Sequence, residues 1–493
     1  MASAFAAFQW VAIGLLCTLP LFNTVTAAPT PLAEDIPQAA IAIKLNKPTS
    51  RTRSLPGPEL VRQLIQKAQS GTGLAKRDTT FKVLPLITSI TPDDLPAMIH
   101  RATDLDPTYE PVDFTAWFQV QFSDHKLPDD GRDPEISQLL NNLAGFHEVA
   151  SCETLGGAPA PSVHASSNPM FASQGYLSGG GVGIDAQYAW GFPGGDGAGT
   201  TIIDIERGWQ LTHEDLIAQN ITLLSGLNTN DRYGGNLPHG TAVLGELLMR
   251  DNTIGGVGIA PSARGHVVGT HRDLNSGPFS ENPPDAILSA TTFLQPGDLI
   301  LLEMQAADAD YNLWPIEIQD AVYDAIRLAT ALGITVIEPA GNGGMGLDGP
   351  VLRDGDTVPQ TFLNRTAPSF RDSGAIMVGA GSSTLPRTRL AFSNHGSRVD
   401  VHAWGENIAT ASVSVGDGYR DSYGVFDGTS GAAPIVAGAA LCAQGIVAAR
   451  RGGGKLAPRE LREVMKLGGT GVQGGGIGVQ PDLRALIDGG VLV

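Results

Sequence analysis

The stretch "FDGTSGAAPIVAGAA" (Phe426–Ala440) places two hydroxyls at the start of a run of small apolar residues. Small side chains over this length predict a helix that packs closely against its neighbours in a core. If Ser430 begins that helix, its backbone N–H and the positive end of the helix dipole can face a developing negative charge. The simpler alternative is that Ser430 only caps the helix. Other motifs in the sequence are needed to distinguish between these two roles of Ser430, nucleophile and helix cap.

The second half of the chain alternates continuous apolar runs with helical stretches, a pattern that predicts a parallel sheet covered by helices on both faces. In such a sheet, reactive side chains gather at the carboxyl ends of the strands. Asp204 ends the run "TTIIDI", and Asn342 follows the run "GITVIEPAG". His239 begins a helical stretch of small residues, "HGTAVLGELL". Ser430 follows "SYGVFDGT", itself a candidate strand.

These four residue types supply what a serine nucleophile needs. A serine hydroxyl barely ionises at neutral pH, so it needs an imidazole to take its proton and a carboxylate to orient that imidazole. The oxyanion that forms needs hydrogen-bond donors where its charge develops. Asp204, His239, Ser430 and Asn342 would fill these four roles, in the chain order of the subtilisin arrangement.

The segments "HGTAVLG", "AGNGG" and "GTSGAAPIVAGAA" resemble the motifs of the subtilisin-like serine proteases, the subtilases. The resemblance implies a three-layer α/β/α domain with a central parallel sheet. It implies that Asp204, His239 and Ser430 are the catalytic triad and that Asn342 supplies the oxyanion-hole amide. It further implies a serine-type endopeptidase that acts on polypeptides through an acyl-enzyme and requires no cofactor, although subtilases often bind structural calcium at sites that sequence hides.

Three carboxylates depart from the family pattern. The usual aspartate segment has Asp, then Ser or Thr, then Gly, whereas this chain reads "DIERGW", with Glu206 two residues after Asp204. Where the family has a Ser-Leu-Gly stretch that lines the substrate, this chain has "LLEMQAAD", which includes Glu303. Glu338 lies just before the asparagine motif. If Glu206 or Glu338 lies close to His239, its charge would raise the pKa of the imidazole.

Two other functions remain open. A sedolisin-like acid peptidase would use a glutamate in place of the histidine base, and the intact "HGT" at His239 argues against it. A catalytically silent binding protein would keep the fold without the chemistry, and the complete set of four groups argues against that. His213, in "LTHEDL", is interpreted as a residue that shapes the turn after Asp204.

The N-terminal part divides by composition. Residues 1–28 hold a short apolar run that ends in small residues, as in a signal peptide, and this predicts a secreted, extracellular protein. Residues 29–80 are Pro-, Thr- and Gln-rich, and we expect a low-complexity pro-segment or linker. The strand-helix-strand pattern of residues 81–155 predicts a small α+β module. Residues 156–182 are a Gly-, Pro- and Ser-rich linker, and residues 183–493 form the catalytic domain.

The module has two interpretations. Subtilases are commonly made as zymogens, with an N-terminal segment that assists folding and occupies the active site until it is removed, and the module resembles such a segment in layout. It would then be an intramolecular inhibitor. The alternative is a permanent accessory domain.

The sequence argues against several kinds of partner. The formal net charge of −18 disfavours a nucleic-acid or anionic-membrane partner, because either requires a basic face. The sequence has no clustered Cys and His ligands for zinc. Signal-peptide cleavage would leave Cys152 and Cys442, which we expect to be free thiols rather than a disulfide.

Overall fold

The structure is a computed structural model that describes residues 38–46, 57–69, 80–91, 93–126, 134–155, 164–165, 171–229, 236–252, 254–272, 280–353, 355–416 and 418–492. These residues belong to one compact unit, Ile36–Val493. The predicted signal peptide, residues 1–28, lies outside the described residues.

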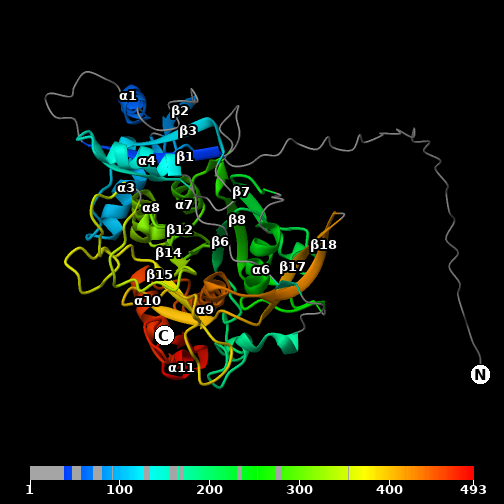
Figure 1. The fold of residues 1–493 in the computed structure, drawn as a ribbon. Helices are drawn as coiled ribbons and strands as arrows, with labels where there is room; N and C mark the ends of the chain where they lie inside the picture. Colours follow the sequence, from blue (N-terminus) through cyan, green and yellow to red (C-terminus); the bar gives the residue numbers. More distant parts are fainter. Residues whose placement is uncertain are drawn as a thin grey trace, which may run out of the picture. The chain divides into compact units, whose positions relative to one another are not determined.

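The centre of the molecule is a seven-stranded sheet in the order β16-β15-β14-β11-β6-β8-β7 (Figure 1). Every neighbouring pair in it is parallel. The strands are β6 (Thr201–Glu206), β7 (Thr222–Ser225), β8 (Arg264–Gly269), β11 (Leu299–Leu302), β14 (Thr335–Pro339), β15 (Ile376–Gly381) and β16 (Val401–Trp404). The parallel sheet predicted from the apolar runs is confirmed.

Helices cover both faces of this sheet, which makes the predicted three-layer α/β/α domain. Helices α6 (Asn236–Leu248) and α9 (Thr429–Arg450) pack on one face, and α7 (Pro283–Thr292) and α8 (Asp320–Ala331) pack on the other. Side chains alternate between the two faces along each strand. In β11, Leu299 and Leu301 join the core beneath α6 and α9, whereas Ile300 and Leu302 join the core beneath α7 and α8.

The chain before Ser430 differs from the prediction. Strands β17 (Ile408–Gly416) and β18 (Gly418–Phe426) form an antiparallel hairpin outside the central sheet, so β18 does not carry Ser430 to the parallel strand ends. Helix α9 does so instead. By length and composition α9 could cross a membrane, but 89% of its most apolar window is buried, as in the core helix of a soluble protein. Its N-cap is Gly428, at φ 91°, so Ser430 lies in the first turn and is not the cap.

The N-terminal module is larger than predicted. Its antiparallel sheet has the order β2-β3-β1-β4, and helices α1 and α4 complete the module. The elements are β1 (Gln38–Leu45), α1 (Gly57–Gln69), β2 (Phe81–Pro85), β3 (Trp117–Lys126), α4 (Pro134–Ala144) and β4 (Val149–Thr154). The region 29–80, predicted to be a low-complexity pro-segment or linker, therefore supplies a central strand and a helix. Strand β1 owes its place to partners about 80 and 110 residues away, which local composition does not reveal.

The catalytic domain also begins earlier than residue 183. Tyr176 and Leu177, within the predicted linker 156–182, are fully buried in the core beneath α6 and α9. The remaining elements are α3 (Asp94–Leu105), η1 (Phe114–Ala116), β5 (His164–Ala165), η2 (Phe171–Ser173), η3 (Gly175–Leu177), α5 (Ala186–Ala189), η4 (Ile217–Gln219), β9 (His271–Arg272), β10 (Ser280–Glu281), β12 (Gln305–Ala307), β13 (Leu313–Pro315), η5 (Ile316–Ile318), α10 (Pro458–Lys466), β19 (Gly469–Thr470), β20 (Gln480–Pro481) and α11 (Leu483–Asp488).

The module lies against α7 and α8 of the catalytic domain (Figure 1). Asp285, in the first turn of α7, accepts hydrogen bonds from the backbone N–H groups of Thr88 and Ser89, each at 2.9 Å. At α8, the Glu153 carboxylate accepts from the N–H groups of Asp320 and Ala321, at 2.6 and 2.8 Å. At Glu153 these backbone hydrogen bonds oppose the effect of burial on the carboxyl group but do not outweigh it.

The contact at α8 predicts that docking of the module depends on pH. Burial, and then the negative charge of Asp320, raise the pKa of Glu153 to about 8. A carboxyl whose pKa rises on docking favours the docked state below its free pKa, and this contribution is lost as pH rises through 8. The melting temperature of the Ser430→Ala chain should therefore fall between pH 5 and pH 8 by several degrees more than that of the same chain carrying Glu153→Gln. Equal falls in the two chains would contradict this prediction.

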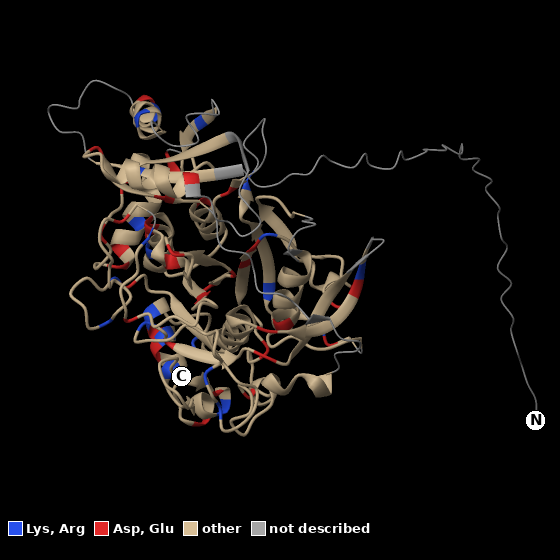
Figure 2. Cartoon of the chain, in the orientation of Figure 1, with Lys and Arg blue, Asp and Glu red and all other residues tan. Residues whose placement is uncertain are grey.

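The distribution of charged residues and the state of the two cysteines are as the sequence indicates. In Figure 2, Lys and Arg are interspersed with Asp and Glu over the described elements. Cys152 and Cys442 are both buried and are not joined by a disulfide, as predicted. Each thiol lies 3.4 Å from a backbone carbonyl oxygen, of Leu140 and Ile259 respectively.

Candidate active site

Strand β6 presents two carboxylates to the face that α6 and α9 cover. Ile203 and Ile205 belong to the opposite core, so the residues between and after them, Asp204 and Glu206, point toward α6. Glu206 is the last residue of β6, whereas Asp204 lies about 7 Å deeper along the strand. Strand alternation therefore does not distinguish the two carboxylates, but their positions along the strand do.

The "HGT" motif brings His239 to the end of β6. A side chain at Gly240 would lie only 2.4 Å from the carbonyl oxygen of Gly208, so glycine lets α6 approach the loop after β6. Thr241 fixes the same contact, because its hydroxyl accepts a 2.9 Å hydrogen bond from the backbone N–H of Gln210. His239 is fully buried, and its ring packs edge-on against Phe426, with 5.1 Å between ring centroids.

Glu206, and not Asp204, contacts the histidine. The Oε1 atom of Glu206 lies 2.5 Å from Nδ1 of His239. Asp204 is also fully buried, but its Oδ2 accepts a 2.7 Å hydrogen bond from the indole N–H of Trp209. Burial, and then the negative charge of Glu206, raise the pKa of Asp204 well above its ordinary value. The structure thus differs from the sequence prediction, which placed Asp204 against His239.

Ser430 and Asn342 lie next to each other at the same edge of the sheet. The Asn342 side-chain oxygen accepts hydrogen bonds from both the N–H and the hydroxyl of Thr429, each at 2.9 Å. Because these bonds engage the oxygen of the amide, its NH₂ group is the part left to donate elsewhere. Ser430 follows Thr429 and is 4% exposed. Its backbone N–H belongs to the first turn of α9, where N–H groups have no acceptor within the helix.

Glu303 is a further carboxyl at this edge, which the sequence interpretation did not assign to the site. It follows β11 and shares the face of Leu299 and Leu301, and its backbone N–H donates to the carbonyl of Ile205 on β6. Burial, and then the charges of Glu206 and Asp204, raise the pKa of Glu303 well above its ordinary value. The Ser430 hydroxyl lies close enough to oppose this rise, although neither Glu303 oxygen has a partner with full hydrogen-bond geometry.

A sequence signal for Glu206 was present. The family pattern is an acid, then one residue, then glycine, and "ERG" (Glu206–Gly208) has this spacing with glutamate in place of aspartate. The signal for Glu303 is weaker: it is the first polar residue after a wholly apolar strand, as expected for the carboxyl end of a buried parallel strand.

The other carboxylate considered near His239 lies elsewhere. Glu338 is 3.6 Å from the Arg398 guanidinium, in a buried network with Glu317. His213 is structural, as expected. It is fully buried, its Nε2 lies 2.9 Å from the carbonyl oxygen of Ser422, and its Nδ1 accepts from the backbone N–H of Asp215.

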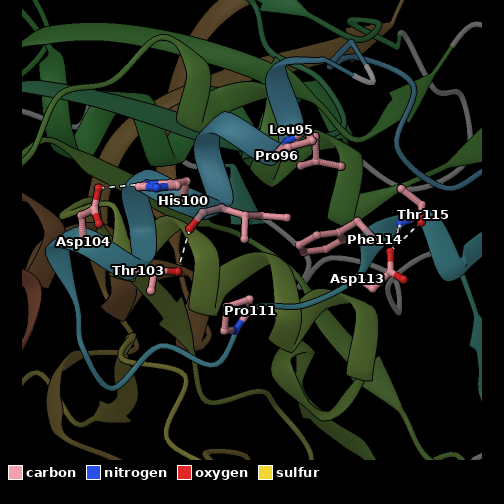
Figure 3. Close-up of a pocket in the computed structure, with 10 residues that line it drawn as sticks. Leu95, Pro96, His100, Thr103, Asp104, Pro111, Asp113, Phe114 and Thr115 are labelled. Atoms are coloured by element: carbon pink, nitrogen blue, oxygen red, sulfur yellow. Dashed lines mark hydrogen bonds and ion pairs between the residues drawn. The ribbon is translucent and has the colours of Figure 1, made fainter. Parts of the chain in front are cut away.

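A pocket of about 460 Å³ lies on the N-terminal module (Figure 3). Its lining residues are Leu95, Pro96, Ile99, His100, Thr103, Asp104, Pro111, Asp113, Phe114 and Thr115. His100 and Asp104 pair with each other at 3.0 Å on the exposed surface of α3. None of the residues at the end of β6 lines this pocket, so it is separate from the candidate active site.

Known proteins are similar to the second half of this chain. The model of the subtilase family matches residues 224–467. The chain is 29% identical over 245 residues to subtilisin DY from Bacillus licheniformis, which covers 50% of this chain and 76% of that protein. It is 27% identical over 244 residues to subtilisin E from Bacillus subtilis (strain 168), which covers 50% of this chain and 55% of that protein.

Among solved structures, fervidolysin from Fervidobacterium pennivorans, described as a keratinolytic enzyme related to subtilisin, has a similar fold. The TM-score is 0.53 at 16% sequence identity, and the likeness covers 92% of this chain and 61% of that one. With the seven-stranded parallel sheet and the family match, the chain is therefore a member of the subtilisin-like serine protease family, the subtilases.

Proposed function

We propose that this protein is a secreted serine endopeptidase whose catalytic triad is Glu206, His239 and Ser430. The observation that carries the proposal is the contact between Glu206 and Nδ1 of His239, which leaves Nε2 of the ring without a hydrogen-bond partner among the described residues. A carboxylate at Nδ1 fixes the tautomer in which Nε2 can accept a proton. Asp204, held by Trp209, supports the strand end beneath the triad.

The proposed reaction uses these three side chains. Nε2 of His239 takes the proton of the Ser430 hydroxyl as the oxygen attacks the peptide carbonyl, and Glu206 stabilises the imidazolium that forms. The same imidazolium then donates its proton to the leaving amine, so the peptide C–N bond breaks and an acyl-enzyme remains. A water molecule, activated by His239 in the same way, releases the acid product and restores the serine.

The proposal assigns oxyanion stabilisation to the Asn342 amide and the Ser430 backbone N–H. Asn342→Asp keeps an oxygen for Thr429 but removes the NH₂ donor, so we expect kcat to fall by about 10²–10³-fold with little change in KM. Thr429→Val is the matched control, since it removes only the hydroxyl bond to Asn342 and should change kcat far less. Steady-state kinetics on a peptide substrate measure both. A loss in Asn342→Asp no larger than in the control would contradict the assignment.

Two alternatives are disfavoured. In a sedolisin-like acid peptidase a carboxylate is the base, whereas here a strand-end carboxylate, Glu206, contacts Nδ1 of a buried imidazole, that of His239. Activity that survives His239→Ala would favour the acid peptidase. A silent binding protein would not need the Asn342 amide held with its NH₂ group free, or a buried imidazole with one ring nitrogen free.

We also propose that the N-terminal module is a removable pro-segment that acts as an intramolecular inhibitor. Its support is the contact with α7 and α8 and the linker that joins β4 to the catalytic domain. Intact-mass analysis of the active secreted protein is the test. A mature chain that begins after residue 155 supports removal, and a chain that retains β1 shows a permanent accessory domain.

Secretion is proposed from the apolar run and small residues of residues 1–28. The family alone does not decide the location, because an intracellular serine protease from Paenibacillus polymyxa is also 27% identical over 263 residues. Expression with and without residues 1–28, followed by assay of medium and cells, is the test.

The protease assignment is tested by active-site labelling. A fluorophosphonate should form one adduct on the mature protein, and peptide mass mapping should place it on Ser430. Lack of an adduct on a folded protein from which the module has been removed would support the silent alternative.

A further inference from the structure

We propose that Glu206, His239 and Glu303 form a binding site for a divalent transition-metal cation such as Zn²⁺, and that the bound cation inhibits the enzyme. The ligand atoms of these three side chains all lie within 4.8 Å of one another. They come from the ends of two neighbouring strands and from the facing helix, so they converge on one point at the carboxyl edge of the sheet.

The distances between the ligand atoms of the three side chains suit one small ion. Zn²⁺ lies about 2.0–2.2 Å from imidazole nitrogen and carboxylate oxygen, so its ligand atoms are about 3–4 Å apart, within reach of small side-chain rotations here. One imidazole and two carboxylates are a donor set that favours zinc-like cations over Ca²⁺ and Mg²⁺, which prefer oxygen ligands alone.

Within the described part of the chain, some buried polar atoms of these three side chains lack hydrogen-bond partners that a cation could replace. Glu303 is 4% exposed, and among the described residues neither of its carboxylate oxygens has a partner with full hydrogen-bond geometry, although the Ser430 hydroxyl lies nearby. Among the described residues, Nε2 of His239 is also buried without a partner. Buried polar atoms without partners are costly, and a cation bound to Glu303 would satisfy its carboxylate.

Further carboxyls lie near the cluster. Besides Glu206 and Glu303, those of Asp204 and Glu246 are fully buried and act on Glu303 electrostatically. A cation bound among them would relieve the like-charge repulsion that disfavours their ionised forms. Family members with serine at the position of Glu303 would lack one of the three ligands. The proposed site therefore depends on a residue in which this chain departs from the family pattern.

Bound metal would stop catalysis directly. A cation on either ring nitrogen of His239 prevents the imidazole from taking the serine proton or from being oriented by Glu206. The binding stands on geometry alone, and only the inhibition rests on the proposed function.

Metal titration of the tag-free, full-length Ser430→Ala chain tests the binding. We expect one equivalent of Co²⁺ to give visible d–d absorption bands, which Zn²⁺ removes and an equal concentration of Ca²⁺ does not. Glu303→Gln in the same chain should weaken Zn²⁺ binding at least tenfold by calorimetry. Glu246→Gln is the matched control, because it also replaces a fully buried carboxyl without partners but lies outside the three ligands.

The outcomes separate binding from function. Absence of one-equivalent binding, or equal affinity in the Glu303→Gln and Glu246→Gln chains with both folded by circular dichroism, would overturn the site. In the active enzyme, micromolar Zn²⁺ should inhibit peptide hydrolysis, EDTA should restore it, and Glu303→Gln should shift the inhibition to at least tenfold higher zinc. If the protein hydrolyses no peptide, the calorimetric result still decides the binding.

Discussion

Glu206→Gln is expected to lower kcat by about 10⁴-fold, and Asp204→Asn by far less. The glutamine side chain has nearly the shape of glutamate, but it has lost the charge that stabilises the imidazolium. It can also present its NH₂ group to Nδ1 of His239 and so hold the ring in the wrong tautomer. The corresponding change in a serine protease triad, aspartate to asparagine, leaves the geometry intact and costs about 10⁴ in kcat.

The comparison with Asp204→Asn decides between the two carboxylates on β6. Asparagine can still accept the Trp209 hydrogen bond, so the strand end should keep its shape. Steady-state kinetics of the two variants, with circular dichroism to show that both are folded, measure the difference. If Asp204→Asn loses as much kcat as Glu206→Gln does, or more, the assignment of Glu206 to the triad is wrong.

Ser430→Ala should have the largest effect of any single change, about 10⁶-fold in kcat. Alanine removes the nucleophile and leaves the oxyanion donors and the substrate-binding surface in place, so residual catalysis of about 10³–10⁴ over water should remain. Binding of substrate should hardly change, because Ser430 contributes a single oxygen atom to the site.

The matched control for Ser430→Ala is Thr429→Val, the neighbouring hydroxyl on the same helix turn. Thr429 bonds Asn342 and has no assigned part in proton transfer, so its loss should cost far less. Progress curves on a peptide substrate measure the rates, and fluorophosphonate labelling measures the reactive serine. A Ser430→Ala protein that still reacts with the probe, or that keeps more than about 1% of the wild-type rate, would place the nucleophile elsewhere.

Much of the fold followed from local patterns. Apolar runs with helices between them predicted the parallel sheet, because a strand buried on both faces has no polar positions. The N-terminal boundary of the module could not be predicted in this way. The sequence of β1 has little that marks it as a strand, and it is one because β3 and β4 pair with its two edges. Likewise, β18 reads as a strand in sequence, but only the folded chain shows that it pairs with β17 outside the central sheet.

For the site, the sequence by itself predicted His239, Ser430 and Asn342 as candidates, because each lies in a motif whose small residues permit close approach. It did not decide which carboxylate meets the imidazole. Asp204 and Glu206 are two residues apart in one strand, so both point toward α6, and periodicity treats them alike. Only the packing of α6 against the end of β6 decides, because it brings His239 to the last residue of the strand. The same edge brings Glu303 beside Glu206, through a strand register that no local pattern encodes.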